Sequence, residues 1–276
     1  MSLSVNHRIY YVNTLQKSSG TNENFKYKFQ IPTEEGYDRV VLLSASIPNS
    51  FYLIQEGLNT FTLRENGVDA IVTIPPGNYS AKVFARIVGP LMTEASPNQW
   101  VYSIALPNQN TEPQTGKFTY SVSGNTSEPS IICTDLVNEQ LGFAAHSINT
   151  FTDGKLISST TVNFGAESAL FIHSDIADSG DSDVLQEIYA GNTETLSYIT
   201  YQCTAPELYS KALQTRQSSV FSFSLTNEKK QLMNLNGVDM QLTICLYKKD
   251  NTSLMMREYM QYKVSLSQTE KTSSEN

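Results

Sequence analysis

The chain has 276 residues and a formal net charge of −8, and Tyr, Thr, Ser, Asn and Phe are plentiful in it. This length is enough for one large domain or two small ones. The negative charge argues against direct binding of nucleic acid, because contacts to phosphates need clustered Lys and Arg. No run of about 18 apolar residues could span a membrane. We therefore expect neither nucleic-acid binding nor membrane insertion.

The cysteines and the N-terminus indicate the compartment of synthesis. Three isolated cysteines predict neither a disulfide framework nor a zinc site. The first residues lack the apolar block of a signal peptide. We expect synthesis in the cytoplasm, which removes glycosylation at the three sequons that begin at Asn78, Asn125 and Asn251.

The chain begins with polar, weakly patterned residues, and we expect residues 1–22 to form an N-terminal arm without a core of its own. The arm carries an apolar run, Ile9 to Val12, which an isolated arm would leave exposed, so we expect it to dock on a neighbouring subunit or on the inner face of a larger assembly. Phe25, Tyr27 and Phe29 then alternate with polar residues, which predicts a strand with one buried face. The nearly continuous apolar run that follows is typical of a strand buried on both faces. Residues 23–59 are therefore expected to open a β-sandwich.

Residues 60–150 show a mixed helix and strand pattern. Asn66-Gly67 between two apolar strands predicts a hairpin with a type I′ turn. Ser80 is a candidate N-cap for a helix whose apolar stripe runs from Val83 to Met92. Three strands and a short helix near residue 140 follow. The segment 60–150 is predicted to be an inserted α+β domain.

Residues 151–266 return to strand patterns, and residues 267–276 contain no core residues and are expected to be disordered. Without the insertion and the tails, the chain has the length that eight strands of about 5–6 residues and their loops require. A tandem pair of such sandwiches would not fit. The predicted fold class is mainly β: a single jelly-roll β-sandwich with an inserted α+β domain.

The run "TIPPGNYSA" before the expected helix admits three interpretations. Asn78 begins a sequon, Gly77 could approach a phosphate, or the run only turns a strand into a helix. A phosphate loop would need more glycines and a following Lys-Ser/Thr pair. We interpret the run as a structural joint.

The histidines and cysteines provide weak catalytic candidates. Cys133 with His146 could suggest a thiol protease, but no motif surrounds either residue, and a lone buried Cys is more often core. His7 falls in the arm, and His173 falls on one face of an expected strand. No catalytic residue and no cofactor is assigned, and the chain is not expected to be an enzyme.

An acidic segment holds Asp175, Asp178, Asp181 and Asp183. Calcium favours such oxygen clusters, but the EF-hand order is not kept. The alternative is a solvated loop of good turn formers, and no metal ligand is assigned. The apolar stripe from Val83 to Met92 has two interpretations as well: a membrane-binding face, or core packing against a sheet. Core packing is more common, and the polar face of this helix lacks the enrichment in Lys and Arg that membrane-surface helices show.

Several segments occur in a fixed order along the chain: "YDRVVLLSASIPNSFYLI", "NTFTL", "TIPPGNYSAKVF", "EQLGF", "LFIHSDI" and "LNGVDMQLTICLY". Together they resemble the minor capsid, or penton, proteins of virophages and related polinton-like viruses. The Ile-Pro-Asn-Ser-Phe-Tyr and Pro-Gly-Asn-Tyr-Ser elements carry most of the resemblance, which spans roughly residues 8–250.

The resemblance implies a jelly roll that bears an inserted domain, with five copies closing an icosahedral vertex next to the major capsid protein of the same virus. It implies a location in the virion after synthesis in the host cytoplasm. A second hypothesis is a carbohydrate- or receptor-binding β-sandwich module, because β-sandwiches often bind sugars at their tips. The two are compatible, since an outward insertion could contact a host receptor or glycan.

Overall fold

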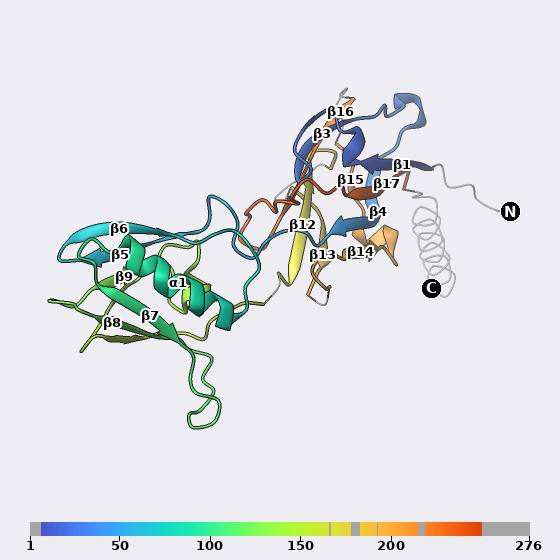
Figure 1. Ribbon diagram of the computed structural model, residues 1–276. Coiled ribbons are helices and arrows are strands. Elements are labelled where there is room, and N and C mark those ends of the chain that lie inside the picture. Colours follow the sequence, from blue (N-terminus) through green and yellow to red (C-terminus); the bar gives the residue numbers. More distant parts are fainter. Residues whose placement is uncertain (1–6, 166, 178–182, 192, 215–218, 250–276) are drawn as a thin grey trace, which may run out of the picture. The chain divides into compact units, whose positions relative to one another are not determined.

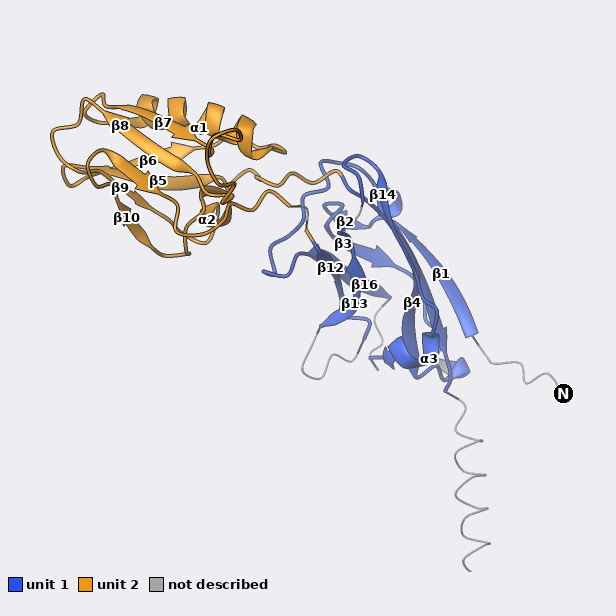
Figure 2. Cartoon of the chain, turned by 90° about the horizontal axis from the view of Figure 1, so that it is seen from below, with its two compact units in different colours: residues 1–49, 168–276 blue, residues 50–167 orange. Residues whose placement is uncertain are grey.

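The computed structural model describes residues 7–165, 167–177, 183–191, 193–214 and 219–249. The chain forms two compact units (Figures 1 and 2): unit 1 is Met1–Asn49 with Ser168–Asn276, and unit 2 is Ser50–Glu167. Unit 2 is therefore inserted in the chain of unit 1. It is longer than the expected segment 60–150, because Ile54 at its start and Phe164 at its end also pack on its core.

Unit 1 contains two antiparallel sheets. The first has the order β1 (His7–Asn13), β17 (Gln241–Tyr247), β4 (Arg39–Pro48), β14 (Tyr198–Gln202), and β15 (Lys211–Ala212) also pairs with β4. The second has the order β13 (Val184–Tyr189), β12 (Ala169–Ser174), β16 (Val220–Thr226), β3 (Asn24–Lys28), β2 (Ser19–Gly20). Short helical turns lie between strands: η1 (Thr14–Gln16), η2 (Thr33–Glu35) and α3 (Pro206–Tyr209).

The strand order of unit 1 is that of a jelly roll. When the two-residue strands are set aside, its strands in chain order are β1, β3, β4, β12, β13, β14, β16 and β17. Numbered in this way, the sheets have the orders 1-8-3-6 and 5-4-7-2. Successive strands alternate between the two sheets except where β12 pairs with β13, as two interleaved Greek keys require. The predicted fold class is confirmed, and the insertion occupies the connection from the third strand to the fourth.

Alternating side chains build the core of this sandwich. In β3, Phe25 and Tyr27 are buried while Lys26 and Lys28 are exposed. Phe25 stacks on Phe223 of the neighbouring strand β16, with ring centroids 5.4 Å apart. Such cross-strand aromatic pairs stabilise a sheet beyond the area they bury. The period-two pattern read from the sequence is therefore the pattern that the sheet uses.

The expectation of an arm over residues 1–22 is wrong for residues 7–20. β1 pairs with β17 at seven successive positions, from His7 opposite Tyr247 to Asn13 opposite Gln241. Val12 is 1% exposed, and the Thr14 hydroxyl donates to Asp239 at 2.8 Å. The strand was not recognised because its apolar residues are consecutive, so the buried set is defined only by the partner strand. Residues 1–6 and the expected tail 267–276 lie outside the described residues.

Unit 2 packs two small sheets around one core. One sheet has the order β10 (Ile148–Thr150), β9 (Ser130–Ile132), β5 (Thr60–Glu65), β6 (Val68–Thr73), and the other has β11 (Lys155–Ile157), β8 (Thr119–Ser123), β7 (Val101–Ala105). The helices are α1 (Ala81–Ala95) and α2 (Asn138–Leu141). Asn66 and Gly67 have φ of 48° and 79°, which are the positive values expected for the hairpin turn between β5 and β6.

The helix α1 lies against the edge strand β7 (Figure 1). Gly89 makes this possible, because a Cβ there would lie 3.3 Å from the Cα of Ser103. The Thr93 hydroxyl oxygen accepts a hydrogen bond from the backbone N–H of Tyr102 at 2.9 Å. Phe84 and Met92, on the predicted apolar stripe, are fully buried in the core of unit 2. The stripe therefore packs inside the protein and covers a sheet edge.

Hydrogen bonds within unit 1 connect the two residues between which unit 2 is inserted, Asn49 and Ser168. The Ser168 carbonyl accepts from the N–H of Ala190 at 2.9 Å, and the Ala190 carbonyl accepts from Thr193 at 3.2 Å. The Thr193 carbonyl in turn accepts from the side-chain amide of Asn49 at 2.9 Å. Three hydrogen bonds thus link the exit residue of unit 1 to its re-entry residue through Ala190 and Thr193.

Candidate functional site

The run that ends at Ser80 forms a joint inside unit 2. The Ser80 hydroxyl oxygen accepts from the N–H of Val83 at 3.3 Å, so Ser80 caps α1 as predicted. Gly77 and Ile54 exchange two backbone hydrogen bonds, of 2.9 and 3.1 Å. The Asn78 side-chain oxygen accepts from the N–H of Leu53 at 2.8 Å. These polar groups hold residues 53–54 against the start of the helix.

This arrangement joins the two most characteristic sequence elements of the chain. Asn49, in the first element, is bound by unit 1 through its side chain and backbone. Leu53 and Ile54, just after that element, are bound by the second element in unit 2. Only residues 50–52 lie between these two attachments. The elements therefore hold the connection between the units.

Cys133 and His146 do not form a site with the features of a thiol protease. Cys133 is 2% exposed, and burial raises the pKa of its thiol to about 12. A nucleophilic cysteine needs the opposite shift. Its polar neighbours are Asn149, whose amide nitrogen lies 3.9 Å from the sulfur, and Ser147. His146 is exposed and has a left-handed φ of 56° in a turn.

His173 lies on the outward side of β12, between two polar partners. Its Nδ1 is 3.0 Å from the carboxylate of Asp183, and its Nε2 is 2.9 Å from the Thr226 hydroxyl. The hydrogen bond with His173 lowers the pKa of Asp183, while partial burial opposes this effect. Asp175 accepts from the backbone N–H of Ser222 at 2.9 Å. His173, Asp175 and Asp183 line a hollow of about 240 Å³ in unit 1.

Asp175 and Asp183 belong to the acidic segment that was considered as a cation site in the sequence. Asp178 and Asp181 lie outside the described residues, so they add nothing to the geometry. Among the residues that the structure describes, no three His, Cys, Asp or Glu side chains form a metal-binding group. Membrane-spanning helices are a separate question. Within the part of the chain that the structure describes, no helix has the length and apolar character needed to cross a membrane.

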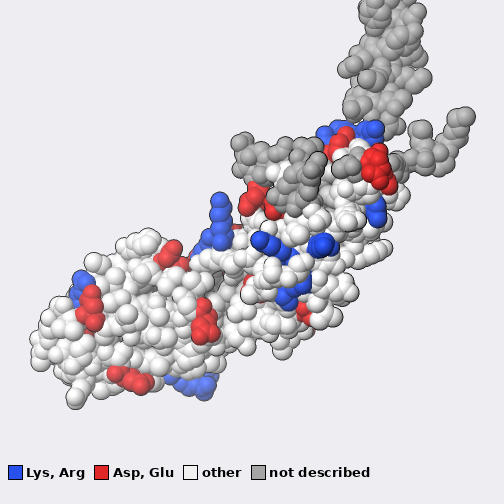
Figure 3. Space-filling view, turned by 90° about the horizontal axis from the view of Figure 1, so that it is seen from above, with Lys and Arg blue, Asp and Glu red and all other residues white. Residues whose placement is uncertain are grey.

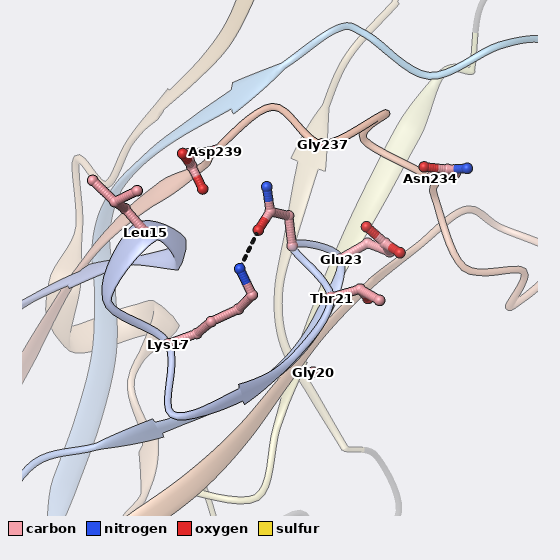
Figure 4. Close-up of a pocket in the computed structure, with 9 residues that line it drawn as sticks. Leu15, Lys17, Gly20, Thr21, Glu23, Asn234, Gly237 and Asp239 are labelled. Atoms are coloured by element: carbon pink, nitrogen blue, oxygen red, sulfur yellow. Dashed lines mark hydrogen bonds between the residues drawn. The ribbon is translucent and has the colours of Figure 1, made fainter.

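Two neighbouring hollows lie around Leu15, at the end of the first sheet. The larger, of about 610 Å³, is lined by Lys17, Glu23, Asn234 and Asp239 among others (Figure 4). Its Lys17 ammonium donates to the side-chain oxygen of Asn22 at 2.8 Å. Both acidic and basic groups face this space, and no sequence motif pointed to it.

The second hollow, of about 460 Å³, is lined by Asn13, Leu15, Ser46, Tyr198 and residues 237–241 except Met240. Four strands of the first sheet contribute to it through these residues. Amide, hydroxyl and carboxylate groups lie beside the Tyr198 ring. This combination can bind a polar ligand such as a sugar, through hydrogen bonds and ring stacking.

Unit 2 contains a buried carboxylate that sequence reasoning missed. Glu65 is fully buried and accepts hydrogen bonds from the Ser96 hydroxyl at 3.0 Å and the Tyr102 hydroxyl at 2.8 Å. It also accepts from the backbone and side-chain nitrogens of Asn98, at 3.1 and 3.0 Å. Burial, and secondarily this hydrogen bond, raises the pKa of Tyr102. The four bonds tie the end of β5 to the turn between α1 and β7 and to β7 itself.

The charged side chains form no broad basic field on the face seen in Figure 3. A small group of Lys and Arg lies over unit 1 in the middle of this view, Asp and Glu lie near it and elsewhere, and most of the visible surface is uncharged.

The comparisons with known proteins give a structural likeness but no match at the level of sequence families. No protein-family model and no curated protein matches the chain. Among solved structures, the chain is similar to the mavirus penton protein, with 10% sequence identity and a TM-score of 0.41, over 88% of this chain and 100% of that chain. A likeness at this level carries no functional argument by itself.

Proposed function

We propose that the chain is a structural subunit of an icosahedral viral capsid, occupying the five-fold vertex as a homopentamer beside the major capsid protein of the same virus. One observation carries the proposal: a complete jelly roll holds a second folded unit in the connection between its third and fourth strands. This is the architecture that the sequence resemblance implies. The subunit would be made in the host cytoplasm and end in the virion.

The motifs behind the resemblance support the same proposal. The Ile-Pro-Asn-Ser-Phe-Tyr and Pro-Gly-Asn-Tyr-Ser elements bind the connection between the units rather than a ligand. A capsid subunit with an inserted domain needs such a joint, whereas an enzyme needs converging reactive groups. We therefore propose a structural role and no catalytic one.

Particle assembly tests the proposal. Co-expression of the chain with the major capsid protein of the same virus is expected to give particles that carry this protein only at five-fold vertices, as seen by electron cryomicroscopy. The major capsid protein alone serves as the control and should give shells with empty vertices. Incorporation at other positions, or stable dimers or trimers without any five-fold ring, would contradict the vertex role.

Binding of a carbohydrate or another receptor remains a second proposed function. The sequence favoured the insertion for this role, but the hollows around Leu15 and Tyr198, which offer polar groups beside an aromatic ring, belong to unit 1. A glycan array probed with the full chain would test it. Binding that is lost in Tyr198→Ala and kept in Tyr189→Ala, an exposed tyrosine outside both hollows, would support it.

A further inference from the structure

A cyclic ring of identical subunits needs two different surfaces, because one side of each copy meets the opposite side of the next. The first sheet of unit 1 has two such sides. β1 and β14 lie at its opposite edges, with β17 and β4 between them. We call the surface of β1 and Leu15 the β1 side, and the surface of β14, α3 and Leu196 the β14 side.

Exposed apolar side chains concentrate on these two sides. Tyr11 on the β1 side and Leu208 on the β14 side are 76% and 83% exposed. In the described part of unit 1, seven of the ten exposed large apolar residues belong to them: Ile9, Tyr11, Leu15, Leu196, Tyr198, Leu208, Tyr209. The remaining three are Tyr189, Leu232 and Val238. Clustered exposure of this kind marks protein contacts, whereas scattered apolar residues need no explanation.

At one end of the sheet, the two sides carry exposed charges of opposite sign. Arg8 begins the β1 side, opposite Leu246 of β17. Glu207 lies at the same end of the sheet on the β14 side, in the helix that contacts β4. Lys211 of β15 lies at the level of Arg8 as well, but its ammonium donates to the Val184 carbonyl. Two copies placed side to side therefore bring Arg8 toward Glu207, which favours this pairing over its reverse.

The strand directions agree with this placement. Each neighbouring pair in the sheet is antiparallel, so β1 and β14 run in opposite directions across the four strands. A copy added in the same orientation thus meets β14 with an antiparallel β1. Edge strands present unpaired backbone groups that such a neighbour can engage.

We infer that the β1 side of one copy docks on the β14 side of the next copy, and that this head-to-tail contact closes the ring. The inference rests on the proposed vertex function for its ring symmetry. It specifies that the partner of each side is a second copy of this chain and not a different protein.

Matched variants of the full chain test the contact by analytical ultracentrifugation. Tyr11→Asp places a charge in the apolar surface of the β1 side, and Leu208→Asp does the same on the β14 side. Leu232→Asp is the control, at an exposed leucine outside both sides. Each side variant is expected to weaken self-association about tenfold or more, and the control is expected to leave it unchanged. All three substitutions are at exposed positions, so an unchanged thermal transition would confirm folding.

Mixing gives the sharper readout. Each side variant retains one intact side, so an equimolar mixture of Tyr11→Asp and Leu208→Asp is expected to form a one-to-one dimer and no ring. Arg8→Glu and Glu207→Arg are expected to weaken association singly and restore it together. Assembly of either side variant at the level of the wild type, or a wild-type chain that stays monomeric at every concentration, would overturn the inference.

The test separates this contact from the vertex proposal. If rings form through both sides but never enter particles, the contact is supported and the vertex role is contradicted. If all side variants still occupy the five-fold vertices, the vertex role is supported and the contact is contradicted.

Discussion

At the scale of single residues, the buried Glu65 makes the sharpest prediction. Glu65→Ala would leave donors on Ser96, Asn98 and Tyr102 without their acceptor. Each unsatisfied buried donor costs about 1–3 kcal/mol, and we expect a loss of roughly 3 kcal/mol in the free energy of unfolding of unit 2 after partial relaxation. Chemical denaturation followed by the fluorescence of Trp100, which is buried in the same unit, would measure it.

Glu128→Ala is the matched control, since Glu128 is an exposed glutamate of the same unit. It is expected to change the free energy of unfolding by less than about 0.5 kcal/mol. Equal effects of the two substitutions would show that the hydrogen-bond network around Glu65 contributes nothing.

The Asp183 carboxylate predicts a dependence of stability on pH. Its pKa is lowered in the folded protein, chiefly by the hydrogen bond with His173. A lowered folded-state pKa stabilises the protein above the unfolded-state pKa of 3.8, and this stabilisation is lost as the pH falls through the folded-state value. The difference in free energy of unfolding between wild type and Asp183→Asn should be constant above about pH 5 and shrink below it. Because the Asp183 side chain is 74% exposed, solvent screening keeps this difference small.

At the scale of elements, Gly89 predicts a reversed substitution effect in α1. Replacing a mid-helix Gly by Ala normally stabilises a helix by about 1 kcal/mol. Here the new Cβ would meet backbone atoms of β7, at 3.3 Å from Ser103 Cα and 3.4 Å from Ile104 N. We expect Gly89→Ala to destabilise unit 2 by about 1 kcal/mol, measured by thermal unfolding. Arg86→Ala, on the exposed face of α1, is the control with little effect. A stabilised Gly89→Ala would mean that the helix moves away from the strand at no cost.

The strand β1 predicts the result of an N-terminal deletion. Removing residues 1–18 would delete a strand that pairs with β17 at seven positions and the buried groups of Val12 and Thr14. Burying one such apolar side chain contributes about 1.5–3 kcal/mol, so unit 1 should be strongly destabilised or unfolded by circular dichroism. Deletion of residues 1–6, which stops before β1, is the control. Unchanged stability of the chain without residues 1–18 would contradict this prediction and would show that these residues form a peripheral arm.

The same strand shows what the sequence could and could not predict. The alternation of Phe25 and Tyr27 with polar residues, and the turn pair Asn66-Gly67, are local patterns, so they were enough to predict a strand and a hairpin. The consecutive apolar residues of β1 could not predict which face of that strand is buried. That face depends on β17, which lies more than 200 residues away in the chain. Glu65 was missed for the same reason: its donors come from a distant turn and a distant strand.

At the scale of the whole molecule, the two units predict that the jelly roll folds without its insertion. All strands of the jelly roll lie in residues 1–49 and 168–276. Replacing residues 50–167 with a short Gly/Ser linker is therefore expected to leave a folded all-β protein with dispersed amide resonances in NMR. The same linker in place of β4, the strand that pairs with both β17 and β14, is expected to abolish folding. An unfolded product of the first replacement would show that unit 1 needs unit 2.

The number of strands and the presence of an insertion followed from chain length and local pattern. The ends of the insertion did not, since residues 50–59 and 151–167 carry no pattern that distinguishes one unit from the other. Nor could the hollow beside Leu15 be predicted, because Lys17, Asn234 and Asp239 come from opposite ends of the chain. Surface sites built from such separate segments become visible only with the topology.

The three hydrogen bonds that connect Ser168 to Asn49 have a consequence for how this gene can change. They hold the two ends of the jelly roll chain between which unit 2 is inserted, and all the groups involved belong to the jelly roll. The jelly roll therefore requires of the inserted domain only that its termini lie close together. Recombination could exchange the intervening segment for an unrelated domain with neighbouring termini, without altering the strands beneath. A lineage built on this chain can therefore renew its inserted domain while its jelly roll stays the same, and the same position is the natural place to display a foreign domain by design.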